Sequence, residues 1–186
     1  PNGNVQQGGH LVWDAERLFC EVKKGIAAAV AKCGKIDSLS IDTWAVDYVL
    51  MQVDKEIFPC YAYRDGRTER AVKEVHAILP FEKLYERTGI QFQPFNTVYQ
   101  LYADKLAGRL EKADGFLMLP EYLLYKLTGK RVCEYTNATS TGLVNAKTHT
   151  FDAEIISSLG LPARLFEKQI VQPGTAIGPL KKEVAA

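Results

Sequence analysis

The spacing of apolar residues changes along this chain of 186 residues, and the order of the changes limits the folds open to it. From Leu18 to Val30 an apolar residue recurs at every fourth position, which is the period of one face of a helix. Asp14 is suited to cap that helix at its start, and Gly34 is suited to end it. The first long element that we expect is therefore a helix that begins after Asp14.

The segments that follow this helix alternate apolar and polar residues, as strands do. We expect strands over residues 36–41 and 47–53, a turn at residues 54–56 and a returning strand over residues 58–62. Beyond residue 64 the helical period returns. The expected helical segments are residues 65–76, a stretch opened by Pro80, residues 97–106, 119–127 and 152–160, and a turn from Pro162, with a loop and a hairpin over residues 134–148. A small sheet followed by a long helical block is an α/β arrangement.

Charge and cysteine content argue against several classes of protein. Lys and Arg number 23 and Asp and Glu number 22, so the net charge of +1 favours neither nucleic acid nor an anionic membrane as a partner. No apolar run approaches the length of a membrane span. The four cysteines lie far apart and without zinc-ligand spacing, which indicates reduced, mostly buried thiols in a reducing compartment. We therefore expect a cytoplasmic protein with no metal site in this chain.

Polar and aromatic residues gather where the first expected strand ends, at Asp42, Thr43, Trp44, Ala45 and Asp47. Loops at the ends of strands often carry the binding residues of α/β proteins. A sugar suits this group, because its hydroxyls bond to carboxylates and its C–H face stacks on a ring such as that of Trp44. The small residue Ala45 would let a ligand approach the backbone. The alternative is that Asp42 and Thr43 only end a strand and that Trp44 belongs to the core.

Two further polar groups also allow a functional and a structural interpretation. Asn96 and Gln100 lie at the start of an expected helix, where they could bind hydroxyl groups or where Asn96 could simply cap the helix. Arg64, Asp65 and Arg67, in the string at residues 63–68, fall at a strand-to-helix turn. There a catalytic arginine is one interpretation, and an Arg–Asp pair that fixes the turn is the other.

The order of these groups along the chain adds information that no single group carries. The chain resembles the FGGY carbohydrate kinases through nearly its whole length, most specifically in the Asp-Thr-Trp-x-Val-Asp string at residues 42–47 and the Phe-Asn-Thr string at residues 95–97. The other matching segments are residues 12–14, 62–68, 88–92, 119–122, 127–129, 134–139 and 173–178. Two residues depart from the family pattern, since Ala45 stands where Gly is usual and Glu121 stands where Asp is usual.

The resemblance implies a ribonuclease H-like domain of the actin-like ATPase type, with a partial sheet and a helical block. Residues 1–186 would form a single partial amino-terminal domain that binds the sugar, with the first phosphate loop upstream and the carboxy-terminal ATP-binding domain missing. The catalytic Asp would lie beyond Ala186, so no catalytic residue is assigned in this chain, and the chain alone would be inactive. ATP and Mg²⁺ would act in the intact enzyme, and neither is expected to be bound to this piece.

The implied reaction is phosphoryl transfer from ATP to the C1 hydroxyl of L-rhamnulose. Two alternatives stay open, namely another kinase of the family that acts on fuculose, xylulose or a related polyol, and a non-catalytic sugar-binding module. The implied substrate-facing residues lie around one concave surface and are Thr43, Trp44, Ala45, Asp47, Asn96 and Gln100. A sheet without its usual neighbours would also expose an edge, through which a dimer could form.

Overall fold

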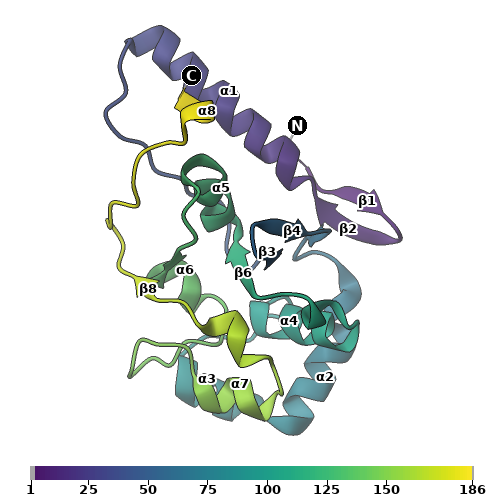
Figure 1. Cartoon of the computed structure of the whole chain (residues 1–186). Coiled ribbons are helices and arrows are strands. Elements are labelled where there is room, and N and C mark those ends of the chain that lie inside the picture. Colours follow the sequence, from purple (N-terminus) through teal and green to yellow (C-terminus); the bar gives the residue numbers. More distant parts are fainter. Residues whose placement is uncertain (1–2, 186) are drawn as a thin grey trace.

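The computed structural model describes residues 3–185, and a long helix lies along one end of it (Figure 1). Strands β1 (Val5–Gln7) and β2 (His10–Trp13) form an antiparallel hairpin that leads into helix α1 (Ala15–Cys33). Asp14 caps α1 by accepting a hydrogen bond of 2.9 Å from the backbone N–H of Arg17. Gly34 ends the helix with a φ of 78°, so both expected ends of this helix are confirmed.

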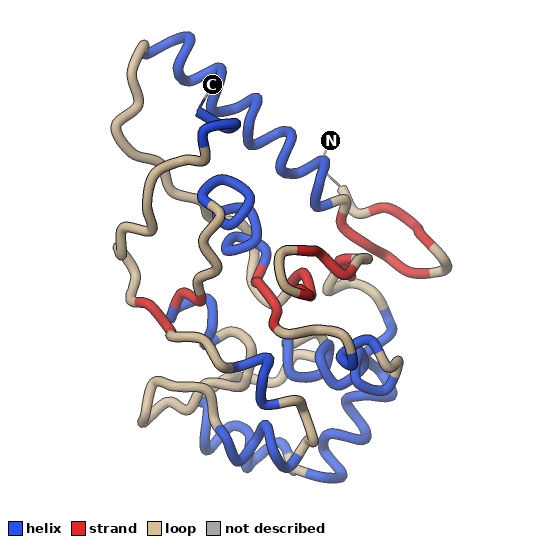
Figure 2. The backbone as a smooth tube through the Cα atoms, viewed as in Figure 1, coloured by secondary structure: helices blue, strands red, loops and turns tan. Residues whose placement is uncertain are grey.

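The strand expected over residues 36–41 does not form, and this prediction is wrong. The segment after α1 is drawn as a loop in Figure 2, and no strand pairing is assigned to it. A strand is stable only when a neighbour bonds to its backbone groups, and within residues 3–185 no strand lies beside this segment to do so. Its apolar side chains are only partly covered, since Ile41 is partly buried against the apolar cluster that includes the start of α1 and α5, and Leu39 is 37% exposed.

The central sheet has the order β4-β3-β6, with all neighbours antiparallel. Its strands are β3 (Tyr48–Gln52), β4 (Lys55–Ile57) and β6 (Gly115–Met118). The expected strand over residues 47–53 is thus confirmed. The chain turns earlier than expected, at Val53 and Asp54, because Val53 adopts a φ of 53° and lets the return strand begin at Lys55.

The strand expected to return over residues 58–62 does not pair with β3, because β4 already occupies that position. Strand β5 (Cys60–Tyr61) pairs with β2 of the first hairpin, which gives a second small sheet of order β1-β2-β5. Strands β7 (Cys133–Glu134) and β8 (Ile170–Val171) form a parallel pair. Residues 3–185 thus form small sheets of two and three strands, as the expected partial sheet requires.

The helical block follows the expected order closely. Its elements are η1 (Gly66–Thr68), α2 (Glu69–Ile78), α3 (Phe81–Thr88), α4 (Thr97–Leu106), η2 (Arg109–Glu111), α5 (Leu119–Thr128), α6 (Tyr135–Thr139), α7 (Ala153–Ser158), η3 (Ala163–Phe166) and α8 (Lys182–Ala185). The loop expected over residues 134–148 contains the short helix α6, because the Glu134 carboxylate accepts bonds from the N–H groups of Thr136 and Asn137. The hairpin there is reduced to one bridge, between Val144 and Phe151.

Strand β3 separates two apolar clusters. Tyr48 and Leu50 face one cluster, which includes five residues of α4, whereas Val49 and Met51 face the other, which includes residues of α5 and the start of α1. This alternation follows from the period of two in a strand. Because α4 packs against β3, the start of α4 lies beside the residues that precede β3, and these two segments build the candidate site.

Two findings bear on the expectations from composition. Cys60 and Cys133 are buried, but Cys20 and Cys33 are exposed on α1, so the prediction of mostly buried thiols is wrong for half of them. No helix within residues 3–185 has both the length and the apolar character to cross a membrane.

Candidate functional site

The side chain of Asp47 lies at the centre of the polar residues that the sequence singled out. It is fully buried, and its Oδ2 accepts hydrogen bonds from Trp13 Nε1 at 2.6 Å, Trp44 Nε1 at 2.9 Å and the backbone N–H of Tyr63 at 3.1 Å. Its Oδ1 accepts a bond of 3.0 Å from Gln100 Nε2. Four N–H donors therefore surround one carboxylate, which has about four lone-pair sites.

Burial raises the pKa of Asp47, while the hydrogen bonds from Gln100 and the two indoles work in the opposite direction. The donors thus partly compensate the charge for its lost hydration. With its acceptor sites engaged inside the protein, the carboxylate is better placed to hold neighbouring side chains than to bind a ligand hydroxyl directly.

Two tryptophan rings meet above this carboxylate. The centroids of the Trp13 and Trp44 rings are 4.3 Å apart, and the ring planes are tilted by 45°. Trp13 ends β2 and Trp44 lies in the loop before β3, so Asp47 joins two segments that are distant in the sequence. Both rings are partly exposed, and because both N–H groups are engaged, any ligand would meet their apolar faces and edges.

The backbone at Val46 is held in an unusual conformation. Its φ is 71°, which is strained for a β-branched residue. Its carbonyl accepts hydrogen bonds from Thr97 Oγ1 at 2.8 Å and Gln100 Nε2 at 3.2 Å, both from the first turn of α4. These bonds fix the turn that carries Trp44 and Ala45.

The six predicted site residues are not equally connected. Trp44, Asp47 and Gln100 are joined by hydrogen bonds, Thr43 donates from its hydroxyl to the carbonyl of Trp44 at 3.1 Å, and Ala45 is exposed. The side chain of Asn96 points elsewhere, as described next. The single concave surface remains a prediction.

Asn96 occupies the N-cap position of α4, but its side chain does not cap the helix. Its Oδ1 accepts a bond of 2.7 Å from the backbone N–H of Gln93, so it closes the turn that precedes α4. The interpretation of Asn96 as a plain helix cap is therefore wrong. The residue is buried and shapes the loop instead of stabilising the first turn of the helix.

The expected Arg–Asp pair forms with a different acid, because the guanidinium of Arg67 pairs with the buried Asp104 and not with Asp65. Asp65 accepts bonds from the backbone N–H of Leu11 at 2.7 Å, from His10 Nδ1 at 3.0 Å and from the backbone N–H of Arg67 at 3.0 Å, so it ties the first hairpin to η1. Burial alone would raise the pKa of Asp65, but these bonds lower it below its ordinary value. The exposed Arg64 has its guanidinium 5.2 Å from the centroid of the Tyr63 ring.

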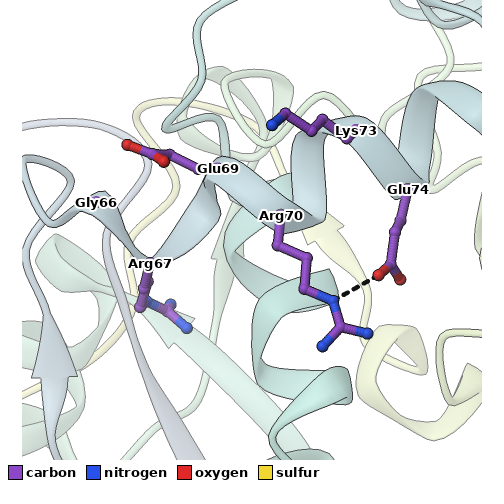
Figure 3. A pocket seen from close by; sticks show the side chains of 6 residues that line it. All are labelled: Gly66, Arg67, Glu69, Arg70, Lys73 and Glu74. Atoms are coloured by element: carbon purple, nitrogen blue, oxygen red, sulfur yellow. Dashed lines mark hydrogen bonds and ion pairs between the residues drawn. The ribbon is translucent and has the colours of Figure 1, made fainter.

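An open hollow of about 550 Å³ lies over η1 and the start of α2. Figure 3 shows its lining, in which Arg70 reaches Glu74 at 2.6 Å, while Arg67 extends in a different direction from Glu69 and Lys73. None of the six predicted site residues lines this hollow. Its charged groups are paired or exposed on the helix surface, as is usual for a solvated face.

The sequence did not identify Trp13 and Tyr63 as site residues. Trp13 completes the pair of indoles, and Tyr63 gives its N–H to Asp47 and its ring to an edge contact with Phe95, 5.3 Å between centroids. Both lie within strings that carry the family resemblance, which was the available signal. Among residues 3–185, no group of three or more His, Cys, Asp or Glu side chains is arranged to hold a metal ion.

The fold and this site place the chain in a class. The model of the FGGY family of carbohydrate kinases, N-terminal domain, matches residues 2–186, and the chain belongs to this family. Among solved structures, gluconate kinase from Lactobacillus acidophilus matches with a TM-score of 0.88 and 25% identity, covering 99% of this chain and 38% of that chain. The α/β fold is thus that of the actin-like sugar kinases.

More similar sequences indicate a particular branch of the family. A rhamnulokinase of Oceanobacillus iheyensis is 44% identical over 186 residues, which cover 98% of this chain and 39% of that protein. A rhamnulokinase of Halalkalibacterium halodurans is 44% identical over 185 residues, with the same coverage of 98% and 39%. The chain therefore spans about two fifths of the length of the curated relatives that it matches.

Proposed function

We propose that this chain forms one wall of the sugar site of a cytoplasmic kinase that transfers a phosphoryl group from ATP to the C1 hydroxyl of L-rhamnulose. The identity to rhamnulokinases, which exceeds that to gluconate kinase, supports the choice of sugar. The observation that carries the proposal is the pair of indoles held by Asp47 at the start of β3.

In this proposal the groups of the wall have distinct tasks. Trp44 stacks on the C–H face of the ketose, and Ala45 lets the sugar approach the backbone. Thr43 gives its proton to a backbone carbonyl, so its hydroxyl oxygen can accept from the sugar. Asp47 and Gln100 hold this loop in place through bonds inside the protein.

The remaining parts of the reaction are not assigned to this chain. Asp47 already accepts four hydrogen bonds and so is a poor general base, and the described residues form no metal-binding group for Mg²⁺. ATP and Mg²⁺ supply the phosphoryl group and its charge neutralisation in kinases of this type. We accordingly expect no turnover of L-rhamnulose with ATP by the purified chain of 186 residues, and measurable turnover would contradict this division of tasks.

The test is Trp44→Ala in the intact kinase. Loss of one stacked, partly buried ring should weaken sugar binding by about 1–3 kcal/mol, so the KM for L-rhamnulose should rise while the KM for ATP stays nearly constant. Tyr85→Ala is the matched control, because Tyr85 is an aromatic residue of α3 that is 53% exposed and whose ring contacts Phe81, outside the wall.

Two results would contradict the proposal. If Trp44→Ala lowers stability but leaves the kinetics for the ketose intact, the ring belongs only to the core. If the intact enzyme turns over xylulose or fuculose with a higher kcat/KM than L-rhamnulose, the choice of sugar is wrong, although a sugar wall remains.

A further inference from the structure

The guanidinium of Arg67 bridges two buried polar groups. Its Nη1 donates to Asp104 Oδ1 at 2.7 Å, and its Nη2 donates to Gln100 Oε1 at 3.4 Å. The side chain of Arg67 is 9% exposed, that of Asp104 is fully buried, and the guanidinium lies 4.1 Å from the centroid of the Tyr61 ring. The guanidinium has little freedom to rotate, because Nη1 is held by an ion pair and the group also packs on an aromatic ring. Its Nη2 therefore points consistently at Gln100.

The surroundings of Gln100 require one orientation of its amide. Nε2 faces three acceptors, namely the Val46 carbonyl at 3.2 Å, Asp47 Oδ1 at 3.0 Å and the Phe95 carbonyl at 3.0 Å. Arg67 can only donate, so it suits Oε1 and would repel the amide N–H₂. Rotating the amide by 180° would place an oxygen against three acceptors and an N–H₂ group against a guanidinium. Arg67 therefore opposes the wrong orientation directly.

We propose that Arg67 is a positioning residue for the sugar wall and acts through Gln100. The bond from Arg67 holds the Gln100 amide so that it supports both the Asp47 carboxylate and the strained carbonyl of Val46. Asp47 in turn holds the two indoles. The effect thus passes from Asp104 through Arg67 and Gln100 to the loop at residues 43–46, although Arg67 has no contact with that loop among its hydrogen bonds. The part of this inference that concerns substrate rests on the proposed function, whereas the link to the indoles does not.

The chain offers a matched control in Arg109. Its Nη1 also pairs with Asp104 Oδ1, at 2.6 Å, and its guanidinium lies 4.7 Å from the centroid of the Tyr61 ring. Its other bonds go to the backbone carbonyls of Ile57 and Pro59 and not to Gln100. Arg67→Lys and Arg109→Lys therefore disturb the same buried acid, but only R67K removes the fork that reaches the amide.

The measurement uses the two tryptophans of this chain, whose indole N–H groups both bond to Asp47. A ¹⁵N–¹H correlation spectrum shows one indole peak for each, assigned with Trp13→Phe and Trp44→Phe. We expect both peaks to shift in R67K and to stay in place in R109K. Unmoved indole peaks in folded R67K, or equal shifts in both variants, would overturn the proposal and leave Arg67 with a general structural role.

A second variant serves if R67K does not fold. Gln100→Met keeps the ion pair between Arg67 and Asp104 and removes the amide through which the effect must pass. The same two indole peaks should shift, and their persistence at wild-type positions would overturn the relay.

The substrate part is tested in the intact kinase. R67K should raise the KM for L-rhamnulose roughly two- to tenfold, the loss expected for one buried hydrogen bond, with the KM for ATP unchanged and R109K near wild type. If the indole peaks shift in R67K but the KM for the ketose does not, the role of Arg67 in substrate binding is overturned, while the link from Arg67 to the indoles stands. The proposed wall fails separately, if Trp44→Ala also leaves the KM for the ketose unchanged.

Discussion

Helices α4 and α1 were both predicted from the spacing of their apolar residues, yet they lie in different environments. Eight of the ten residues of α4, Thr97 to Asp104, are buried, whereas only Ala15 and Phe19 of the 19 residues of α1 are. α4 lies against β3 and α2, while α1 packs mainly on α5 along the edge of the molecule (Figure 1). Pattern alone thus specifies a helix, but the elements around it decide how much of its surface is removed from water.

Polar groups differ between the two regions in the same way. Beside α4, Asp104 is buried and pairs with two arginines, whereas the ion pair of Glu21 and Lys24 on α1 has side chains 40% and 72% exposed. Such surface pairs contribute little to stability. On the α1 side there is also a mainly apolar hollow of about 880 Å³, lined by residues of α1 and α5 and by residues 36–40, 176–180 and 184–185. We infer that most of the stability of this chain resides around α4 and β3.

The largest effect is expected at Asp104. Asp104→Asn leaves Arg67 and Arg109 buried without their counter-charge, which should lower the free energy of unfolding by about 3–5 kcal/mol. The measurement is urea unfolding, with Asp37→Asn as the control, because the pair of Asp37 with Lys35 is 79% and 85% exposed. Equal losses in the two variants would remove the proposed contrast between the regions.

A smaller loss is expected at Asp47. In Asp47→Asn one carboxylate oxygen becomes an N–H₂ group that faces N–H donors, so the free energy of unfolding should fall by about 2–3 kcal/mol. The exposed Asp42 provides the control, Asp42→Asn, which should be neutral. If Asp47→Asn is as stable as wild type, the carboxylate is not the centre of this hydrogen-bond group.

The pKa of Lys168 provides a test of how well the segment between the helical block and α1 is packed. Its Nζ bonds to the Phe116 carbonyl, and burial lowers the pKa of Lys168 to about 8. Between pH 8 and the ordinary pKa of lysine, the unfolded chain binds more protons at this position than the folded chain, so folding stability gains as pH rises. We expect this gain, of the order of 1–3 kcal/mol, to be absent in Lys168→Met.

The measurement is the difference in unfolding free energy between wild type and Lys168→Met at pH 7 and pH 10. Taking the difference cancels the titration of the other groups. A constant difference across this range would show that Lys168 is not held away from water.

The smallest effect is expected on the outer part of α1. Val30 is 43% exposed, so Val30→Ala should change the free energy of unfolding by no more than about 0.5 kcal/mol. Leu101→Ala, in the buried α4, should cost about 2–5 kcal/mol in the same assay. A large loss for Val30→Ala would mean that the end of α1 is covered in solution, for example by a second copy.

Much of the fold could be predicted because it depends on neighbours in the chain. Asp14 and Gly34 bound α1 as expected, and α4 spans residues 97–106 as its pattern predicted. The strand over residues 36–41 could not be judged in this way. Its apolar and polar residues do alternate, but a strand also needs a hydrogen-bonded neighbour, which can come from any part of a chain. Within residues 3–185 no strand pairs with this segment.

The candidate site, like the fold, combines features that the sequence indicated with features that only the tertiary structure decided. The residue types around Trp44, Asp47 and Gln100 left a structural interpretation open, and the family resemblance selected these residues as candidates before any contact was known. That the Asp47 carboxylate is saturated, and that Trp13 supplies one of its donors, depends on β2, the loop before β3 and α4 meeting in space. Helix caps and hydrophobic periods depend on residues that are close in the chain, so they can be predicted from the sequence alone. A buried charge finds its donors only after the chain has folded, so the tertiary structure alone decided which residues satisfy Asp47 and which of them hold the loop at residues 43–46.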